Sequence, residues 1–119
     1  MEANQEWKIV FIDDEADIRE VIRITLADAG YRIWTAEDGE AGIRLSRRVT
    51  PQIVITDIRM PRMHGIQVLE TLKQTQPDIE VIVATAFGEM DLAIRALQLD
   101  ASDFITKPFN DDALHTALA

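Results

Sequence analysis

The chain alternates short apolar runs with segments of helical periodicity, and this alternation restricts the fold more than any other feature. Runs rich in β-branched residues predict strands at 8–12, 31–36, 53–57, 80–85 and 103–106. Apolar residues spaced three and four apart predict helices at 15–29, 39–49, 66–77 and 89–99, with Asn110 as the cap of a last helix. Strands separated by helices pair in parallel through right-handed crossovers, so we expect an α/β fold with helices on both faces of one sheet.

Two of the predicted helices carry signals of their ends and of their inner faces. Asp14 is available as the N-cap of the first helix, and Gly30 is placed to end it. The second helix opens at Asp38, and Gly42 inside it lowers its propensity by about 1 kcal/mol relative to alanine. Its apolar residues four apart predict the inward face, namely Ala41, Leu45 and Val49.

Composition indicates one domain and excludes several kinds of site. The chain has 119 residues, of which 47% are hydrophobic, so we expect a single domain over 1–119. No run approaches the roughly 20 apolar residues of a membrane span, and the first residues do not form a signal peptide, so we expect a cytoplasmic protein without membrane contact. Cysteine is absent, which excludes disulfides and thiolate sites. A net charge of −9, from 21 acidic and 12 basic residues, argues against direct nucleic-acid binding by this segment.

Polar residues stand where the predicted strands end. Asp57 ends the third strand abruptly, Asp13 and Asp14 follow the first, Thr85 ends the fourth, and Lys107 follows the fifth. In parallel α/β sheets the carboxyl ends of the strands share one rim, and sites lie beyond that rim. We therefore expect three carboxylates, one hydroxyl and one ammonium group to meet there.

These residue types suit phosphoryl transfer to a carboxylate. Three neighbouring carboxylates repel one another unless a cation lies between them, and Mg²⁺, or Mn²⁺ in its place, suits a few carboxylate oxygens that share a phosphate. With the metal ion and Lys107 neutralising charge, Asp57 could act as a nucleophile and form an acyl phosphate. Thr85 and Lys107 would then bind the phosphoryl oxygens.

The pattern resembles the receiver domains of two-component response regulators over essentially the whole chain. The motifs that carry the resemblance are Asp13-Asp14, D-x-x-M-P-x-M-x-G at 57–65, Thr85-Ala86, Phe104 and K-P-F at 107–109. The resemblance implies a flavodoxin-like (βα)5 doubly wound sandwich with a five-stranded parallel sheet of order 2-1-3-4-5. It also implies a signalling domain that catalyses its own aspartyl phosphorylation and dephosphorylation, not a conventional enzyme.

The resemblance assigns roles to individual residues. Asp57 would be the phosphoacceptor for a histidine kinase or phosphotransfer domain, and Ala86 would join Thr85 and Lys107 around the phosphoryl group. Phe104 would turn inward into the space that Thr85 vacates, and more strongly than a tyrosine because it has no hydroxyl. The implied metal ligands are Asp13 through water, Asp14, Asp57 and the backbone carbonyl of Arg59, and the peptide bond before Pro108 would be cis.

The resemblance also implies partners. The switch would change the surface of the fourth helix, fifth strand and fifth helix, through which the domain could form a homodimer. The final helix stops at Ala119 after about two turns, so we expect a segment excised from a longer protein, with an output domain C-terminal to residue 119.

Three positions beyond the shared motifs lead to further hypotheses. Asp100 stands where the family often has glycine, and aspartate tolerates the left-handed conformation that a helix exit can need. Arg59 and Phe87 follow Asp57 and Thr85 by two positions. We expect their bulk to impede the hydrolytic water and to prolong the phosphorylated state.

Other functions fit the sequence less well. An aspartyl phosphatase of the haloacid-dehalogenase type needs a second aspartate two residues after the nucleophile, where this chain has Arg59. A flavodoxin-like FMN site needs a hydroxyl- and glycine-rich loop after the first strand, where this chain has the acidic DDEAD. A receiver used as an unphosphorylated interaction module remains the principal alternative. His64 and His115 are isolated, and we expect surface histidines rather than metal ligands.

Overall fold

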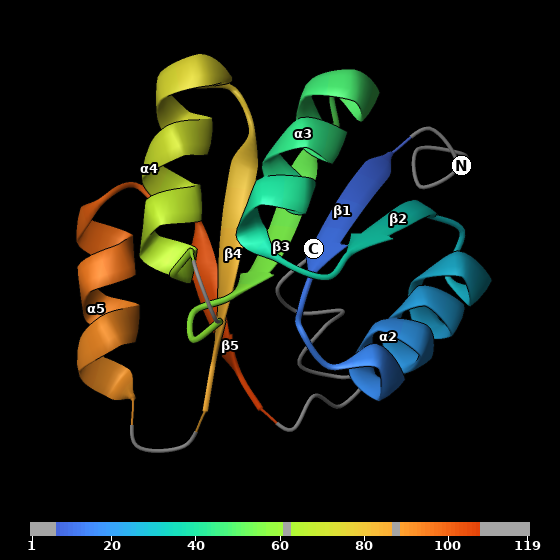
Figure 1. The fold of residues 1–119 in the computed structure, drawn as a ribbon, viewed down its shortest axis with the longest axis horizontal. Helices are drawn as coiled ribbons and strands as arrows, with labels where there is room; N and C mark the ends of the chain where they lie inside the picture. Colours follow the sequence, from blue (N-terminus) through green and yellow to red (C-terminus); the bar gives the residue numbers. More distant parts are fainter. Residues whose placement is uncertain (1–6, 61–62, 87–88, 108–119) are drawn as a thin grey trace.

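The computed structural model of the chain describes residues 7–60, 63–86 and 89–107, which form one sheet flanked by helices (Figure 1). The strands are β1 (Lys8–Ile12), β2 (Arg32–Ala36), β3 (Ile53–Asp57), β4 (Glu80–Thr85) and β5 (Asp103–Thr106). The helices are α2 (Ala16–Asp28), α3 (Gly39–Val49), α4 (Gly65–Thr75) and α5 (Met90–Gln98). All strand pairs are parallel and the order is β2-β1-β3-β4-β5, which confirms the predicted fold and strand order. The helix expected after Asn110 lies outside the described residues.

The described helices cover the two faces of the sheet unequally (Figure 1). On one face α2 packs alone, where its Ile22 and Leu26 join a core with residues of β1 and β3. On the other face, side chains of α3, α4 and α5 form a second core with alternate residues of the same strands. The central strand β3 is buried along its whole length, as its continuous apolar run predicts. Within the described ranges, no helix is long and apolar enough to span a membrane.

The start of α2 differs from the prediction. Its N-cap residue is Glu15, whose side chain makes no capping hydrogen bond. The Glu15 N–H instead donates to Oδ1 of Asp13 at 2.9 Å, so the predicted capping by Asp14 is wrong. The end of the helix is as expected, because Gly30 follows it with a positive φ of 100°.

The inner face of α3 is rotated from the predicted one. Ala41, Leu45 and Val49 are only half-buried. A Cβ on Gly42 would overlap the side chain of Ile12 in β1, so the helix can approach the strand this closely only because that position is glycine. The fully buried positions of α3 are Gly39, Gly42, Ile43 and Ser46.

The start of α4 is fixed against the end of β3. The Gly65 N–H donates to the carbonyl of Ile58 at 2.7 Å, and a Cβ on Gly65 would lie 2.6 Å from the Ile58 Cα and overlap the Asp57 carbonyl. His64 is half-buried and caps the helix: its Nδ1 accepts from a backbone N–H at 3.3 Å, while Gln67 accepts from the His64 N–H at 3.0 Å. His64 is thus a structural cap, where the sequence suggested only a surface residue.

The exit of α5 confirms the expectation for Asp100. Its φ is 77°, a left-handed conformation that glycine adopts without cost and aspartate with some strain. The N–H groups of Asp100 and Ala101 donate to carbonyls of the last helical turn at 3.2 and 3.0 Å. The chain therefore leaves the helix as sharply as with a glycine, at some cost in stability.

Candidate functional site

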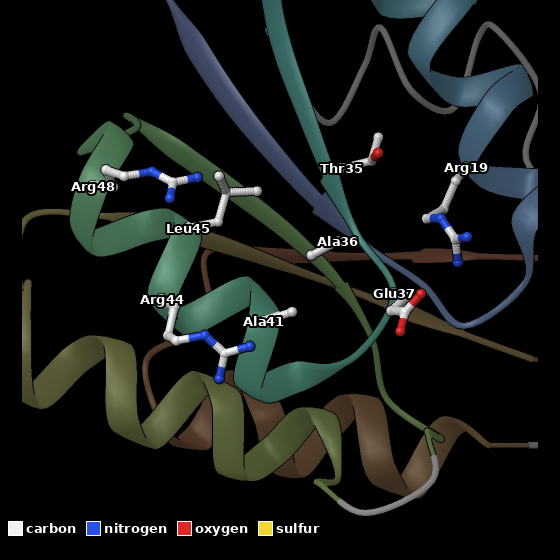
Figure 2. A pocket seen from close by; sticks show the side chains of 8 residues that line it. All are labelled: Arg19, Thr35, Ala36, Glu37, Ala41, Arg44, Leu45 and Arg48. Atoms are coloured by element: carbon white, nitrogen blue, oxygen red, sulfur yellow. The ribbon is translucent and has the colours of Figure 1, made fainter.

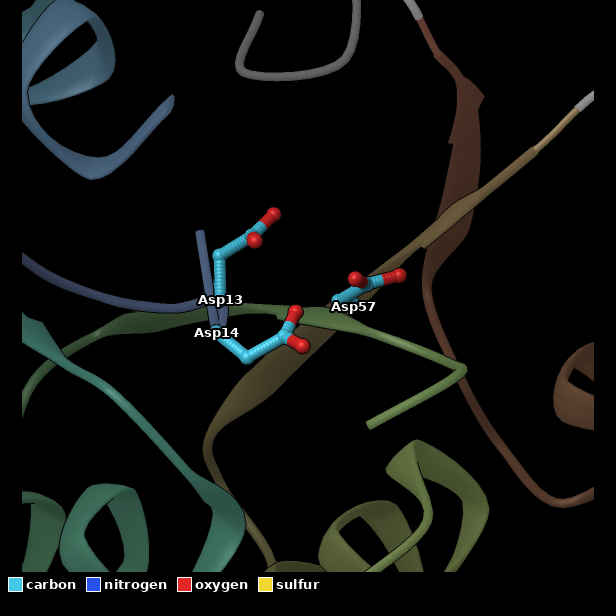
Figure 3. A group of neighbouring side chains, drawn as sticks. All are labelled: Asp13, Asp14 and Asp57. Carbon is cyan, nitrogen blue, oxygen red and sulfur yellow. The ribbon is translucent and has the colours of Figure 1, made fainter. Parts of the chain in front are cut away.

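Strand register brings the predicted polar residues to one rim of the sheet. Asp57 pairs with Ala84 across β3 and β4, and Thr85 pairs with Thr106 across β4 and β5. Asp13 follows β1 directly, and Figure 3 shows its carboxylate beside those of Asp14 and Asp57 at the ends of β1 and β3. The expected convergence of these strand ends is present in the structure.

We call Asp13, Asp14 and Asp57 the acidic cluster. Each offers one carboxylate oxygen, and these oxygens lie within 4.8 Å of one another. Asp13 has no exposed surface and Asp57 is 7% exposed, whereas Asp14 is exposed. Charges this close and this far from water repel strongly, so the cluster needs a cation.

Lys107 supplies one positive charge to the acidic cluster. Its Nζ donates to Oδ2 of Asp57 at 3.0 Å and lies 2.9 Å from Oδ2 of Asp13. The carboxylate of Glu15 is more distant, at 3.7 Å. A single ammonium group is therefore shared between the two buried carboxylates.

Burial and charge alter the acidity of both partners. Burial raises the pKa of Asp57 to about 6; Lys107 opposes this shift, and the charges of Asp13 and Asp14 add to it. Burial alone would lower the pKa of Lys107, but its contacts with Asp13 and Asp57 outweigh burial and raise it. Lys107 is therefore charged at neutral pH, while Asp57 ionises at a higher pH than an ordinary aspartate.

The ligand set of the acidic cluster fits a hard divalent cation. Its three carboxylates provide oxygen ligands of the kind that Mg²⁺ binds. Oδ2 of Asp13 is buried and has an ion pair but no hydrogen bond of normal geometry among the described residues. A second cation between these oxygens would reduce the repulsion by Asp13 and Asp14 that adds to the effect of burial on the pKa of Asp57.

Thr85 lies at the same rim and is almost fully buried, with 1% of its surface exposed. Its carbonyl accepts a hydrogen bond from the Lys107 N–H at 2.7 Å. The end of β4 therefore holds the backbone of the residue whose ammonium group reaches Asp57.

The Ala86 N–H is already occupied. It donates to Oε1 of Glu89 at 3.1 Å, and Oε2 of the same carboxylate accepts a short hydrogen bond from Nε of Arg59. Glu89 is largely buried, with 15% of its side chain exposed, while that of Arg59 is 68% exposed. Sequence reasoning treated Glu89 only as the start of a helix, although its position three residues after Ala86 was a signal that a capping carboxylate could reach back.

Phe104 is half-buried and packs against the core beneath α3, α4 and α5. In the sheet it pairs with Val83 of β4, two residues before Thr85. The inward position of Phe104 that the resemblance implies remains a prediction, as does the movement of Phe104 with the phosphorylation state.

Two predicted site residues, Phe87 and Pro108, lie outside the described residues. The cis peptide bond and the proposed effect of Phe87 on the phosphoryl lifetime remain predictions. The backbone carbonyl of Arg59 as a metal ligand also remains a prediction. The side chain of Arg59 is directed to Glu89 in this structure.

Comparisons with known proteins show the family to which the chain belongs. The family model of the response regulator receiver domain matches residues 9–119. The chain is 35% identical over 115 residues to the probable transcriptional regulator ycf27 of Porphyra purpurea. The aligned region covers 97% of this chain and 47% of that protein. It is 39% identical over 101 residues to the DNA-binding transcriptional regulator NtrC of Escherichia coli, covering 85% of this chain and 22% of NtrC.

A solved structure extends the agreement to the fold. The crystal structure of a response regulator receiver domain protein from Clostridium thermocellum superposes with a TM-score of 0.90 at 32% identity, covering 94% of this chain and 90% of that one. The chain spans about half the length or less of the curated relatives just described, 47% and 22%.

Proposed function

Because the chain belongs to the family of response regulator receiver domains, we propose that its signalling role is carried by a phosphoryl group on Asp57. Receiver domains are phosphoacceptor signalling domains rather than conventional enzymes. The observation that supports Asp57 most directly is its contact with Lys107, 3.0 Å away, inside a cluster of three carboxylates. Such a site can neutralise an incoming phosphoryl group that the carboxylates alone would repel.

The donor is the phosphohistidine of a histidine kinase or phosphotransfer domain. A carboxylate oxygen of Asp57 attacks phosphorus, and the new P–O bond forms as the P–N bond to the imidazole breaks. The imidazole leaves with the electron pair and becomes neutral histidine once it has taken one proton. The products are an acyl phosphate on Asp57 and an unmodified donor.

Asp13, Asp14 and Asp57 would hold Mg²⁺, or Mn²⁺ in its place, together with the backbone carbonyl of Arg59. When bound, the ion supplies positive charge to the carboxylates and the phosphoryl oxygens. The three carboxylate oxygens, which lie within 4.8 Å of one another, support this assignment. Lys107 would keep the phosphoryl group oriented by an ion pair to its oxygens.

The phosphoryl group competes with Glu89 for one hydrogen-bond donor. The Thr85 hydroxyl and the Ala86 N–H would bind its oxygens, but that N–H now donates to Glu89. We expect the phosphoryl group to displace Glu89 from this N–H, which would also disturb the ion pair of Glu89 with Arg59. The released Arg59, with Phe87, would then be able to shield the acyl phosphate from water and prolong its lifetime.

The signal passes through Thr85 to the surface of α5 and β5. When the Thr85 hydroxyl moves toward the phosphoryl group, Phe104 fills the vacated space. On α5, three large apolar side chains are exposed at spacings of four and three, namely Met90, Ile94 and Leu97. Such a stripe supports a contact with a second copy of the domain or with another partner.

The longer proteins that this chain resembles suggest the remaining architecture. The chain matches about half or less of the two relatives described above, both named as transcriptional regulators. We place residues 1–119 as a single receiver domain of a longer cytoplasmic protein, with an output domain C-terminal to residue 119 and a histidine kinase as its partner.

The decisive experiment is phosphorylation by a small donor. Incubation with acetyl phosphate and Mg²⁺ should add one phosphoryl group, seen by mass spectrometry of the intact protein, and mild base should remove it. Asp57→Ala should abolish the gain, whereas Asp78→Ala, which removes an exposed carboxylate from a loop, should leave it unchanged. No gain in the wild-type protein would leave only a receiver that acts as an unphosphorylated interaction module.

A further inference from the structure

A second polar site lies beside the outer strand β2, between α2 and α3. It is an open cavity of about 470 Å³. Figure 2 shows that side chains from both helices point into it. Arg19 comes from α2, and Arg44 and Arg48 come from α3. We call this site the arginine cavity. Its volume is within the usual range for small-molecule sites, about 300 to 1,000 Å³.

The residues that line the arginine cavity carry more positive than negative charge. Three of the 12 basic residues of the chain line it, against the single carboxylate of Glu37. Arg44 and Arg48 are four residues apart on one helix, a spacing at which like charges destabilise a helix by about 0.2–0.5 kcal/mol. Neither has a hydrogen bond or ion pair with any residue in the described part of the chain. In a domain of net charge −9, such a group is an unusual local excess of positive charge.

The lining also suits the organic part of a ligand. Ala36, Ala41 and Leu45 provide apolar surface, and Thr35 adds a residue with a hydroxyl group. Guanidinium groups bind phosphate oxygens in pairs, and a phosphate monoester carries about −1.5 to −2 charges at neutral pH. That negative charge would balance the net positive charge of the three arginines and one glutamate that line the cavity.

The arginine cavity is joined to the acidic cluster through the backbone of Asp13. Nη1 of Arg19 donates to the Asp13 carbonyl at 2.8 Å. The Asp13 N–H donates to the carbonyl of Ala36, which lies at the end of β2, at 3.1 Å. Both backbone hydrogen-bonding groups of Asp13 are therefore held by residues that line the cavity.

We propose that the arginine cavity binds a small phosphate-bearing ligand and that its occupancy shifts the backbone of Asp13. Arg44 and Arg48 bind the phosphate group, with the apolar floor under the organic part. Arg19 is the positioning residue that connects the ligand to Asp13, because it can share its guanidinium group between them. The proposal does not depend on phosphorylation of Asp57.

Titration of the intact domain with two probes, AMP and inorganic phosphate, tests the site. Two-dimensional NMR spectra are recorded with EDTA at constant ionic strength. We expect saturable shifts of the side-chain N–H signals of Arg44 and Arg48 and of the backbone amide of Asp13. Tighter binding of AMP would assign the ligand to phosphate esters, and equal binding would assign it to inorganic phosphate. Absence of saturable shifts with either probe would overturn the proposal.

Matched charge removals identify the residues responsible. Arg44→Gln with Arg48→Gln should weaken the apparent Kd at least tenfold. Arg47→Gln removes the same charge from the same helix but outside the cavity, and should leave the Kd unchanged. Equal weakening by both changes would reduce the effect to overall charge and contradict the proposal. Circular dichroism of each variant checks the fold.

The link to Asp13 has its own test. In Arg19→Gln at saturating ligand, the Thr35 amide should still shift while the Asp13 amide no longer does. If the Asp13 shift persists in this variant, the proposed coupling through Arg19 is wrong.

Discussion

The acidic cluster and the arginine cavity both lie against the segment that follows β1, but they differ in sign and in burial. In the acidic cluster two of three carboxylates are buried, and Lys107 is shared between them. In the arginine cavity the side chains of Arg44 and Arg48 are exposed and have no partner among the described residues. One cluster contains its own counter-charge, whereas the other depends on solvent ions or a ligand.

The difference shows that burial, more than the number of charges, decides how strongly the members of a like-charge cluster change one another's pKa and the stability of the fold. Removal from water makes the Asp57 carboxylate hard to ionise, and its pKa rises to about 6. Exposed charges on α3 interact through water, where two unit charges 4 Å apart are worth only about 1 kcal/mol. We therefore expect removal of one charge to have large effects in the acidic cluster and small effects in the arginine cavity.

The largest effect should follow from Lys107→Met. Without the ammonium group two buried carboxylates lose their only described counter-charge, and the free energy of unfolding should fall by about 3 kcal/mol. Urea denaturation in EDTA measures the change. As a control, Lys73→Met removes a surface ammonium group that donates to a carbonyl at 2.8 Å, and should cost less than about 1 kcal/mol. Equal losses of stability in the two variants would show that Lys107 stabilises the acidic cluster no more than a surface lysine stabilises its surroundings.

An effect of similar size and opposite sign, which depends on pH, should follow from Asp57→Asn. A carboxyl group whose pKa is raised by folding contributes stability that is fully present below its unfolded pKa, near 3.8, and lost as pH rises through about 6. Asp57→Asn should not show this loss of stability, so the variant should be up to about 3 kcal/mol more stable than the wild type at pH 7.5 in EDTA and nearly equal to it at pH 4. Denaturation at a series of pH values measures the difference. A gain that does not depend on pH would show that ionisation of Asp57 is not its cause.

Glu89→Gln should have an effect on phosphorylation rather than on stability. Weakening the hydrogen bond from the Ala86 N–H and the ion pair with Arg59 removes competition for the phosphoryl group, so its incorporation from acetyl phosphate should become up to about tenfold faster. Rapid quenching with mass spectrometry measures the rate. Asp91→Asn, in the first turn of the same helix, is the control for helix electrostatics and should leave the rate unchanged. A slower rate in Glu89→Gln would argue against displacement of Glu89.

The smallest effect should follow from Arg44→Gln. Relief of repulsion from Arg48 and loss of attraction to Glu40, each four residues from Arg44, are both worth about 0.2–0.5 kcal/mol, so the free energy of unfolding should change by less than about 0.5 kcal/mol. The change is therefore much smaller than that of Lys107→Met, although both substitutions remove one positive charge. A larger loss of stability in ligand-free protein would show that Arg44 has a structural partner.

The acidic cluster was predictable because strand order and strand ends place its members. Asp57 and Lys107 are 50 residues apart in sequence, yet each stands at the end of a strand, and parallel strands bring such ends together. Glu89 was not predictable in the same way. Its role depends on the turn between β4 and α5 directing its carboxylate back to the Ala86 N–H, and periodicity does not describe turns.

The inner face of α3 could not be read from hydrophobicity either. Gly42 and Ser46 are more deeply buried than Leu45 because the helix is too close to β1 for a large residue. Residue size therefore outweighs apolar character at this contact. The arginine cavity depends on the same placement, since Arg44 and Arg48 take their positions from the rotation of α3, which the spacing of Ala41 and Leu45 misplaced.

The contact between Gly42 and Ile12 has a mechanical consequence. Because the side chain of Ile12 lies directly against the backbone of Gly42, a rotation of α3 about its own axis would press a bulkier neighbouring residue against Ile12. Ile12 is the residue directly before Asp13. A displacement of α3 at the arginine cavity should therefore be felt first at the residue that adjoins the acidic cluster.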